Sequence, residues 1–300
     1  ITVDEPFTNL LTQGMVCKET FKCKVHGWLY PEEVVEGRCS HCQQPVQVGR
    51  VEKMSKSTRN VVDPEALIAR YGADTARLFC LFAAPPEKDL DWNDQGVEGT
   101  FRFLNRVWRL VVENLSLLNA VAPCKGTPVL SAEQRALRFK THTTIKKVTG
   151  DIEDRFHFNT AISSIMELVN VLYQCELQKV REEHTLSVIR EAVETVVILL
   201  SPMAPHLAEE LWRKLGYEES ILKTPWPRYD PAAEVQEEIV MVVQVNGKLR
   251  SKVTVAADAT DEEVGKMALA DEKTQRWITG KKIQKVIVAP KRLVNIVVGQ

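Results

Sequence analysis

The sequence lacks a long apolar run, since none approaches the roughly 20 residues that a membrane-spanning helix needs. The stretch Ala192–Leu200 is apolar but short, and charged Arg190, Glu191 and Glu194 lie in or beside it. An excess of one charge is also lacking, because the formal net charge is -1. We therefore expect no association with a membrane. The balanced charge leaves nucleic acid open as a partner, because acid elsewhere can offset a basic face.

An initiating methionine and a basic, apolar signal region are also missing, since the chain begins with Ile1. We interpret the chain as a fragment, a processed subunit or a trimmed product, and we expect a cytoplasmic location. Internal repeats and low-complexity tracts are absent from the sequence. The length of 300 residues predicts two or three domains, because single cores stop growing at about 250–300 residues.

Four of the seven cysteines lie near the start of the chain: Cys17, Cys23, Cys39 and Cys42. Without a secretory signal, such a group is better interpreted as metal ligands than as disulfides. Cys23-x2-His26 is followed, after a spacer, by Cys39-x2-Cys42, which is the spacing of a tetrahedral structural zinc site. His41 and Cys17 are alternative fourth ligands. The alternative without metal is a surface loop with unpaired cysteines.

Apolar periodicity predicts a helical bundle in the middle of the chain. Asp63 is a good N-cap before Pro64, and Ser131 with Gln134 resembles a capping box. The predicted helices cover about 64–71, 73–83, 95–119, 132–153, 158–178, 184–200 and 204–215.

The last part of the chain has the pattern of a small α+β domain. Strands are predicted over Ile239–Val245 and Lys248–Val255, joined by the hairpin signal Asn246-Gly247. A helix over about 262–270 and strands at Lys285–Ala289 and Val294–Val298 follow. The predicted division is therefore 1–62 with a cysteine-bearing insert at about 20–50, a helical bundle at 63–230, and an α+β domain at 237–300.

The segment Lys53-Met54-Ser55-Lys56-Ser57 carries two lysines three residues apart among small hydroxyl side chains. Two ammonium groups on one movable loop can close over a polyphosphate and stabilise charge on a departing pyrophosphate. The alternative is an ordinary solvated basic loop. The string itself favours the first interpretation, because Lys-Met-Ser-Lys-Ser is the second signature of class I aminoacyl-tRNA synthetases.

The following residues strengthen this resemblance. Asn60-Val61-Val62-Asp63-Pro64 and Tyr71-Gly72-Ala73-Asp74 resemble the leucyl, isoleucyl, valyl and methionyl enzymes. The resemblance implies that Lys56 is the main ATP contact, that Lys53 is its partner, that Met54, Ser55 and Ser57 lie near the nucleotide, and that Mg²⁺ accompanies ATP. Many relatives have glycine where this chain has Arg59, so we expect a stiffer loop here.

Other segments resemble the leucyl-tRNA synthetases of the bacterial type: Phe82–Glu87, Arg102–Trp108, Ser201–Trp212, Val243–Arg250 and Leu293–Gly299. This resemblance implies a mostly α fold with α+β parts: the end of a Rossmann-type catalytic domain with the lysine loop, a bundle that binds the tRNA anticodon stem, and a C-terminal α+β domain that binds tRNA. It also implies ATP-dependent attachment of leucine to tRNA(Leu) through leucyl-adenylate. The first signature, the nucleotide-binding half and the editing domain are lacking, so we expect the chain to need an N-terminal catalytic and editing part and to be inactive alone.

Basic residues are candidates for contacts with tRNA phosphates. Arg102, Arg106 and Arg109 share one helix face, and the C-terminal domain carries Lys248, Arg250, Lys252, Lys281, Lys282, Lys285, Lys291 and Arg292. The alternative for both groups is an ordinary solvated surface. His206, which follows a proline at a helix start, is interpreted as structural rather than catalytic.

Three other functions stay open at the level of sequence. The chain could be a tRNA-binding subunit without activity of its own, or part of a valyl or isoleucyl enzyme. It could also be a zinc-bearing adaptor that no longer uses the lysine loop.

Overall fold

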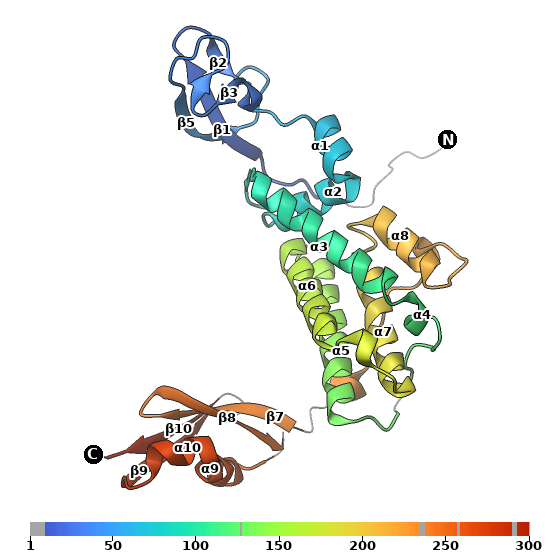
Figure 1. The fold of residues 1–300 in the computed structure, drawn as a ribbon, viewed down its shortest axis with the longest axis vertical. Coiled ribbons are helices and arrows are strands. Elements are labelled where there is room, and N and C mark those ends of the chain that lie inside the picture. Colours follow the sequence, from blue (N-terminus) through green and yellow to red (C-terminus); the bar gives the residue numbers. More distant parts are fainter. Residues whose placement is uncertain (1–9, 127, 235–237, 257–258, 290–292, 300) are drawn as a thin grey trace. The chain divides into compact units, whose positions relative to one another are not determined.

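The computed structural model describes residues 10–126, 128–234, 238–256, 259–289 and 293–299. Contacts between residues divide the chain into two compact units, Ile1–Asp230 and Pro231–Gln300 (Figure 1). Within these described ranges, every helix is too short or too polar to span a lipid bilayer.

The first unit starts with a small β-structure that surrounds the cysteines. Its strands are β1 Val16–Cys23, β2 Gly27–Leu29, β3 Val34–Val35, β4 Arg38–Cys39, β5 Gln47–Lys53 and β6 Leu90–Asp91. Strand β1 pairs antiparallel with β2 and β5, and parallel with β6. The predicted turn-rich insert is thus more regular than expected, because hydrogen bonds to β1 turn both of its flanks into strands.

The rest of the first unit is helical, as predicted. Its helices are α1 Pro64–Tyr71, α2 Ala73–Phe82, α3 Asp94–Val112, α4 Leu115–Leu118, α5 Ala132–Glu153, α6 Phe158–Gln174, α7 Glu183–Leu200 and α8 Pro205–Lys214. The Asp63 side chain accepts a hydrogen bond from the Glu65 amide at the start of α1. Ser131 and Gln134 form the predicted capping box of α5.

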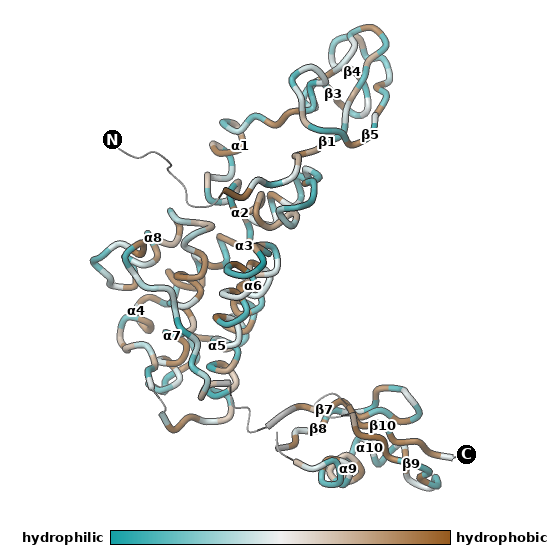
Figure 2. Tube along the Cα trace, turned by 180° about the vertical axis from the view of Figure 1, so that it is seen from behind, coloured by the Kyte–Doolittle hydropathy of each residue, from teal (hydrophilic) through white to brown (hydrophobic). Residues whose placement is uncertain are grey.

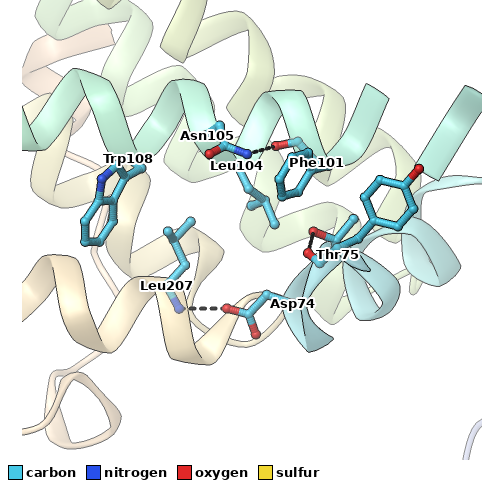
Figure 3. A pocket seen from close by; sticks show the side chains of 8 residues that line it. Asp74, Thr75, Phe101, Leu104, Asn105, Trp108 and Leu207 are labelled. Carbon is cyan, nitrogen blue, oxygen red and sulfur yellow. Dashed lines mark hydrogen bonds between the residues drawn. The ribbon is translucent and has the colours of Figure 1, made fainter. Parts of the chain in front are cut away.

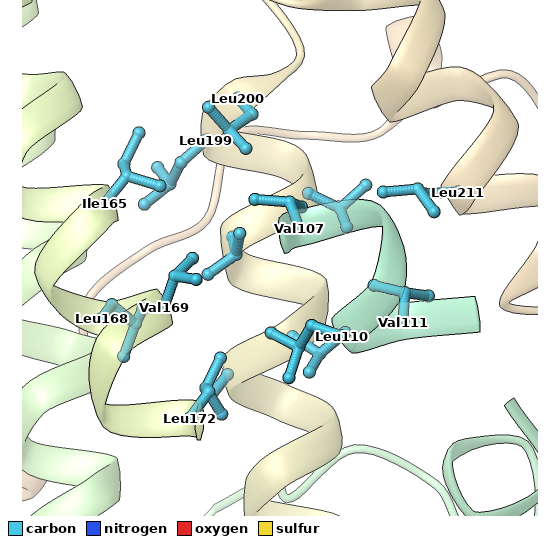
Figure 4. Packing of buried hydrophobic residues seen from close by; sticks show 14 of the residues in the cluster. Val107, Leu110, Val111, Ile165, Leu168, Val169, Leu172, Leu199, Leu200 and Leu211 are labelled. Carbon is cyan, nitrogen blue, oxygen red and sulfur yellow. The ribbon is translucent and has the colours of Figure 1, made fainter. Parts of the chain in front are cut away.

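An apolar core joins these helices. Figure 4 shows how Val107, Leu110 and Val111 of α3 meet side chains of α6, α7 and α8. The α6 contribution is Ile165, Leu168, Val169 and Leu172, all of which are buried. Aliphatic residues at three- and four-residue spacing therefore form the interior of the bundle, as the periodicity predicts.

The prediction of one helix over 95–119 is wrong at its end. Helix α3 stops at Val112, and the short α4 follows after a turn at Asn114. The Asn114 side-chain amide donates to the Leu110 carbonyl, 2.9 Å away. A side chain that bonds to nearby backbone competes with the helical pattern, which explains the break. The helix predicted over 158–178 likewise ends at Gln174, before Glu176 adopts a positive φ of 43°.

The second unit is a four-stranded sheet with helices on one face, the predicted small α+β domain. Its elements are β7 Glu238–Val245, β8 Lys248–Ala256, α9 Asp261–Ala270, α10 Glu272–Ile278, β9 Ile283–Ala289 and β10 Leu293–Val298. The strand order is β8-β7-β10-β9. Asn246 and Gly247 both have positive φ, as the predicted hairpin requires. Strands β7 and β10 carry much of the apolar sequence coloured in Figure 2.

Candidate functional site

The two lysines of the signature differ in backbone setting. Lys53 is the last residue of β5 and pairs with Cys17 of β1, while Lys56 lies in the following turn. The Met54 amide donates to the Val16 carbonyl at 2.9 Å. The expectation that both lysines project from one flexible loop is thus corrected for Lys53, because pairing with β1 continues up to that residue.

The turn after Lys53 is organised by the fully buried side chain of Asn60. Its amide nitrogen donates to the carbonyls of Lys18 and Glu52, at 3.0 and 3.1 Å. Its Oδ1 accepts from the Ser55 amide at 2.9 Å and from the Thr58 hydroxyl at 2.8 Å. This role of Asn60 was not predicted, although Asn60 belongs to the motif that carries the resemblance.

The hydroxyl groups of the signature are paired with each other. Ser55 Oγ lies 2.7 Å from Ser57 Oγ and accepts from the Ser57 amide at 3.2 Å. Lys53 and Lys56 are exposed, and neither forms an ion pair within the described part of the chain. Two ammonium groups therefore face solvent, one at the end of β5 and one on the polar turn after it, where an anionic ligand can reach them.

Arg59 links this turn to the cysteine-bearing insert. It has a φ of 53°, in the left-handed region that side chains other than glycine seldom adopt. Its guanidinium group lies 3.6 Å from Glu33 Oε2 and 5.2 Å from the centre of the Tyr30 ring. A hydrogen bond with His41, together with the Tyr30 amide, holds the pKa of Glu33 below its ordinary value. The carboxylate thus stays charged opposite Arg59.

The four predicted metal ligands lie together. Their ligand atoms, from Cys23, His26, Cys39 and Cys42, all lie within 4.8 Å of one another. Cys23 and Cys39 are buried, and hydrogen bonds from the His26 and Val25 backbone lower the pKa of Cys23 to about 6. A thiolate is the form of cysteine that binds metal.

The two alternative ligands have other contacts. The ring of His41 lies 5.3 Å from that of His26, centre to centre, but its Nε2 is 2.9 Å from Glu33 Oε1. Cys17 pairs with Lys53 across the strands, where burial raises the pKa of its thiol. Neither residue belongs to the group of ligand atoms around Cys23.

The candidate tRNA contacts on α3 have different surroundings. Arg102 is exposed, whereas Arg106 donates to Asn170 Oδ1 at 2.9 Å and lies 4.8 Å above the Tyr173 ring. Arg109 is exposed as well.

In the second unit, most of the candidate lysines are exposed: Lys248, Lys252, Lys281, Lys282 and Lys285. Arg250 instead stacks on Trp277, with its guanidinium carbon 3.4 Å from the ring centre. Lys291 and Arg292 lie outside the described residues.

His206 has a structural partner. Its Nδ1 is 2.7 Å from Asp74 Oδ1, and Asp74 Oδ2 accepts from the Leu207 amide at 2.7 Å. Asp74 of α2 thus caps the start of α8, which has no cap of its own. Figure 3 shows the bond between the Leu207 amide and Asp74 beside a hollow lined by Phe101, Leu104, Trp108 and other residues.

Comparison with known proteins gives concordant results. Residues 134–265 match the model "Anticodon-binding domain of tRNA ligase", and residues 45–93 match "tRNA synthetases class I (I, L, M and V)". Leucine–tRNA ligases of Syntrophus aciditrophicus and Desulfatibacillum aliphaticivorans are 57% and 56% identical over 99% and 98% of this chain. The chain covers 35% and 34% of these relatives, so it spans about a third of their length.

A solved structure supports the same relationship. The Agrobacterium radiobacter K84 agnB2 LeuRS, in the ternary complex LeuRS-tRNA-LeuAMS, matches 83% of this chain and 31% of its own, with a TM-score of 0.66 and 32% identity. The curated relatives match nearly the whole chain, so the lysine signature, the bundle and the small α+β domain all lie in matched sequence. The chain belongs to the leucine–tRNA ligase family of class I aminoacyl-tRNA synthetases.

Proposed function

We propose that this chain supplies the ATP-binding loop and the tRNA-binding surfaces of a leucine–tRNA ligase. The observation that carries the proposal is the pair of exposed lysines, Lys53 and Lys56, on a strand end and a turn ordered by Asn60. Such a site offers exposed positive charge to an anionic ligand.

The chemistry is formation of leucyl-adenylate. A carboxylate oxygen of leucine attacks the α-phosphorus of ATP, the bond to the bridging oxygen breaks, and pyrophosphate leaves with the electron pair. Lys53 and Lys56 stabilise the charge that develops on the β- and γ-phosphates. Ser55, Ser57 and the backbone of Met54 line the same turn and contact the nucleotide. Mg²⁺ bound to ATP neutralises further phosphate charge.

The tRNA partner is tRNA(Leu), in the cytoplasm. Arg102 and Arg106 on α3 meet phosphates along the anticodon stem, while the C-terminal domain contributes Lys248, Arg250, Lys282, Lys285, Lys291 and Arg292. Support comes from the exposure of most of the described residues in this set and from the tRNA in the matching LeuRS-tRNA-LeuAMS complex. Such contacts add affinity without reading sequence.

The division at about 62 and 237 assigns the lysine loop to the end of a catalytic domain and the other parts to tRNA. Leucine binding and editing then belong to a part of the enzyme that this chain does not contain. We therefore predict that the isolated chain does not catalyse leucine-dependent ATP–pyrophosphate exchange. Exchange by the isolated chain would refute this division.

The role of Lys56 is tested in a chimeric ligase in which this chain replaces the matching third of the Syntrophus aciditrophicus relative. Lys56→Ala should lower kcat for leucine-dependent ATP–pyrophosphate exchange by about 10²–10³, the usual cost of removing one donor to transition-state charge. Lys53→Ala should lower it by a smaller factor.

The matched control is Lys88→Ala, which removes an exposed lysine from the segment between α2 and β6. It should leave kcat unchanged. If the double variant at positions 53 and 56 exchanged pyrophosphate at the wild-type rate, the chain would be a tRNA-binding part whose lysine loop does no chemistry.

A further inference from the structure

The geometry of the cysteine-bearing insert fits one specific metal. Tetrahedral Zn²⁺ with Zn–S near 2.3 Å and Zn–N near 2.0–2.1 Å places its ligands about 3.8 Å apart for two sulfurs and about 3.6 Å apart for sulfur and nitrogen. Cys23 Sγ lies 3.5 Å from Cys42 Sγ, and His26 Nδ1 lies 3.8 and 3.6 Å from Cys23 Sγ and Cys39 Sγ. The set has four ligands, which closes the coordination sphere of a structural site.

The insert has little apolar interior to hold it without metal. Its fully buried cluster consists of Cys23, Leu29 and Cys39, two of them candidate metal ligands, and the residues packed against it are only partly buried: Phe21, Val34, Cys42 and Val46. Segments of fewer than about 40 residues usually need disulfides or metals to fold. We therefore expect metal coordination to supply most of the free energy that holds Pro31–Glu33 and His41 in place.

Glu33 connects the insert to the lysine turn, which is the segment Met54–Asn60 after β5. His41 lies between ligands Cys39 and Cys42, and its Nε2 contacts Glu33 Oε1. Glu33 Oε2 accepts from the Tyr30 amide at 2.8 Å and faces Arg59. A continuous set of contacts thus runs from the ligand pair to the backbone of the lysine turn.

Arg59 is the residue of the lysine turn that these contacts reach. Its left-handed conformation costs roughly 1–2 kcal/mol and persists only where surrounding contacts enforce it. Arg59 directly precedes Asn60, whose side chain orders Ser55 and Thr58. Release of Arg59 would therefore loosen the whole turn.

We propose that Cys23, His26, Cys39 and Cys42 bind one structural Zn²⁺, and that the loaded insert holds the lysine turn in its ordered conformation by clamping Arg59 between Tyr30 and Glu33. The significance of the clamp for catalysis rests on the proposed function of the lysine loop. Its existence does not, because it can be measured without ATP.

The test uses the whole chain, purified from zinc-supplemented medium. Zinc is measured per chain, and amide hydrogen exchange is compared with and without removal of the metal by a chelator. We expect about one zinc per chain. Removal should accelerate exchange of the Met54 and Ser55 amides at least about tenfold, while amides of α6 and α7 keep their rates. Cys39→Ser should have the same effect, and Cys175→Ser, a cysteine outside the insert, should have none.

Glu33→Gln separates the clamp from the metal. It removes the charge opposite Arg59 but leaves the four ligands, so zinc content should stay at about one while exchange at Met54 and Ser55 rises several-fold. Zinc-free protein from zinc-supplemented medium would overturn the metal site. Unchanged exchange in both the chelated protein and Glu33→Gln would overturn the clamp, and so would equal loss of protection in α6 and α7. None of these outcomes depends on Lys56, whose test measures pyrophosphate exchange.

Discussion

The helical bundle and the cysteine-bearing insert lie in one unit but are stabilised by different means. In the bundle, a large cluster of buried aliphatic side chains joins α3, α5, α6, α7 and α8. In the insert, the buried cluster has one aliphatic side chain, Leu29, and two cysteines. The contacts that Asn60 and Glu33 make with the lysine turn are polar.

This difference separates a rigid support from a movable part. Regions with few buried apolar contacts open at low free energy, and the elements that close over ligands are drawn from them. The lysine turn lies at the edge of the weakly packed insert, while the bundle has a large apolar core. A single chain thus combines a part that can open at low free energy and a part that resists opening.

The largest effect that this comparison predicts is in the bundle. Leu168→Ala removes a fully buried side chain from α6 and leaves a cavity, so the free energy of unfolding should fall by about 2–5 kcal/mol. Urea unfolding followed by far-UV circular dichroism measures this loss, because the helices dominate that signal.

The same substitution should leave the insert untouched, with zinc content and exchange at Ser55 as in the wild type. Leu222→Ala, which truncates a leucine that is 80% exposed, is the control and should change stability by less than about 0.5 kcal/mol. Loss of zinc from Leu168→Ala would show that the two regions unfold as one and would remove the contrast.

The bundle could be predicted from the sequence because its signals are local. The capping box of Ser131 and Gln134 and the apolar periodicity of Val107 and Leu110 act within one or two turns, so several helix bounds were predicted to within a residue or two. The ends of α3 and α6 were missed, because Asn114 and Glu176 leave the helical conformation without proline or glycine.

The polar contacts of the site were harder to predict because they join distant residues. Asn60 bonds to Lys18, 42 positions earlier, and Arg59 meets Glu33 across the insert. The spacing of Cys23, His26, Cys39 and Cys42 is short-range and did single out the four ligands that lie together. Excluding Cys17 required the pairing of β1 with β5, and excluding His41 required its contact with Glu33, neither of which the spacing contains. Helix α10 was not predicted, since Glu272–Ile278 is too short to show a clear period.

A smaller, more local effect is expected at the lysine turn. Asn60→Ala removes the acceptor of the Ser55 amide and the two hydrogen bonds donated to the Lys18 and Glu52 carbonyls, at a cost of about 1–3 kcal/mol for a buried polar group. This cost should appear as faster exchange of the Ser55 amide and lower pyrophosphate exchange by the chimeric ligase. The urea midpoint of the bundle should stay the same.

Asn105→Ala is the matched control, since within the described residues that exposed asparagine on α3 bonds only locally, to the Phe101 carbonyl. It should change neither measurement. A global loss of stability in Asn60→Ala would mean that the turn supports the bundle, contrary to the comparison.

The smallest predicted effect on stability is at α8, on the edge of the bundle, where Glu209 makes polar contacts as Glu33 does in the insert. The Glu209 carboxylate accepts from the Ile221 amide and the Ser220 hydroxyl, both at 2.9 Å, and pairs with Arg213 at 3.0 Å. The Ile221 hydrogen bond, followed by those from Ser220 and Arg213, lowers the pKa of Glu209.

A carboxyl group whose pKa is lower in the folded state stabilises the fold above its unfolded pKa and loses this contribution as the pH falls through the folded value. Glu209→Gln should therefore reduce the midpoint slightly at pH 7 and make it less sensitive to acid below about pH 4.3, the ordinary pKa of glutamate. Thermal melts across that range measure the change, with Glu210→Gln as the control because Glu210 pairs with the side chain of Lys214 rather than with backbone. If both variants responded to acid alike, the contacts of Glu209 would contribute no more than a surface ion pair, and apolar burial alone would account for the edge of the bundle.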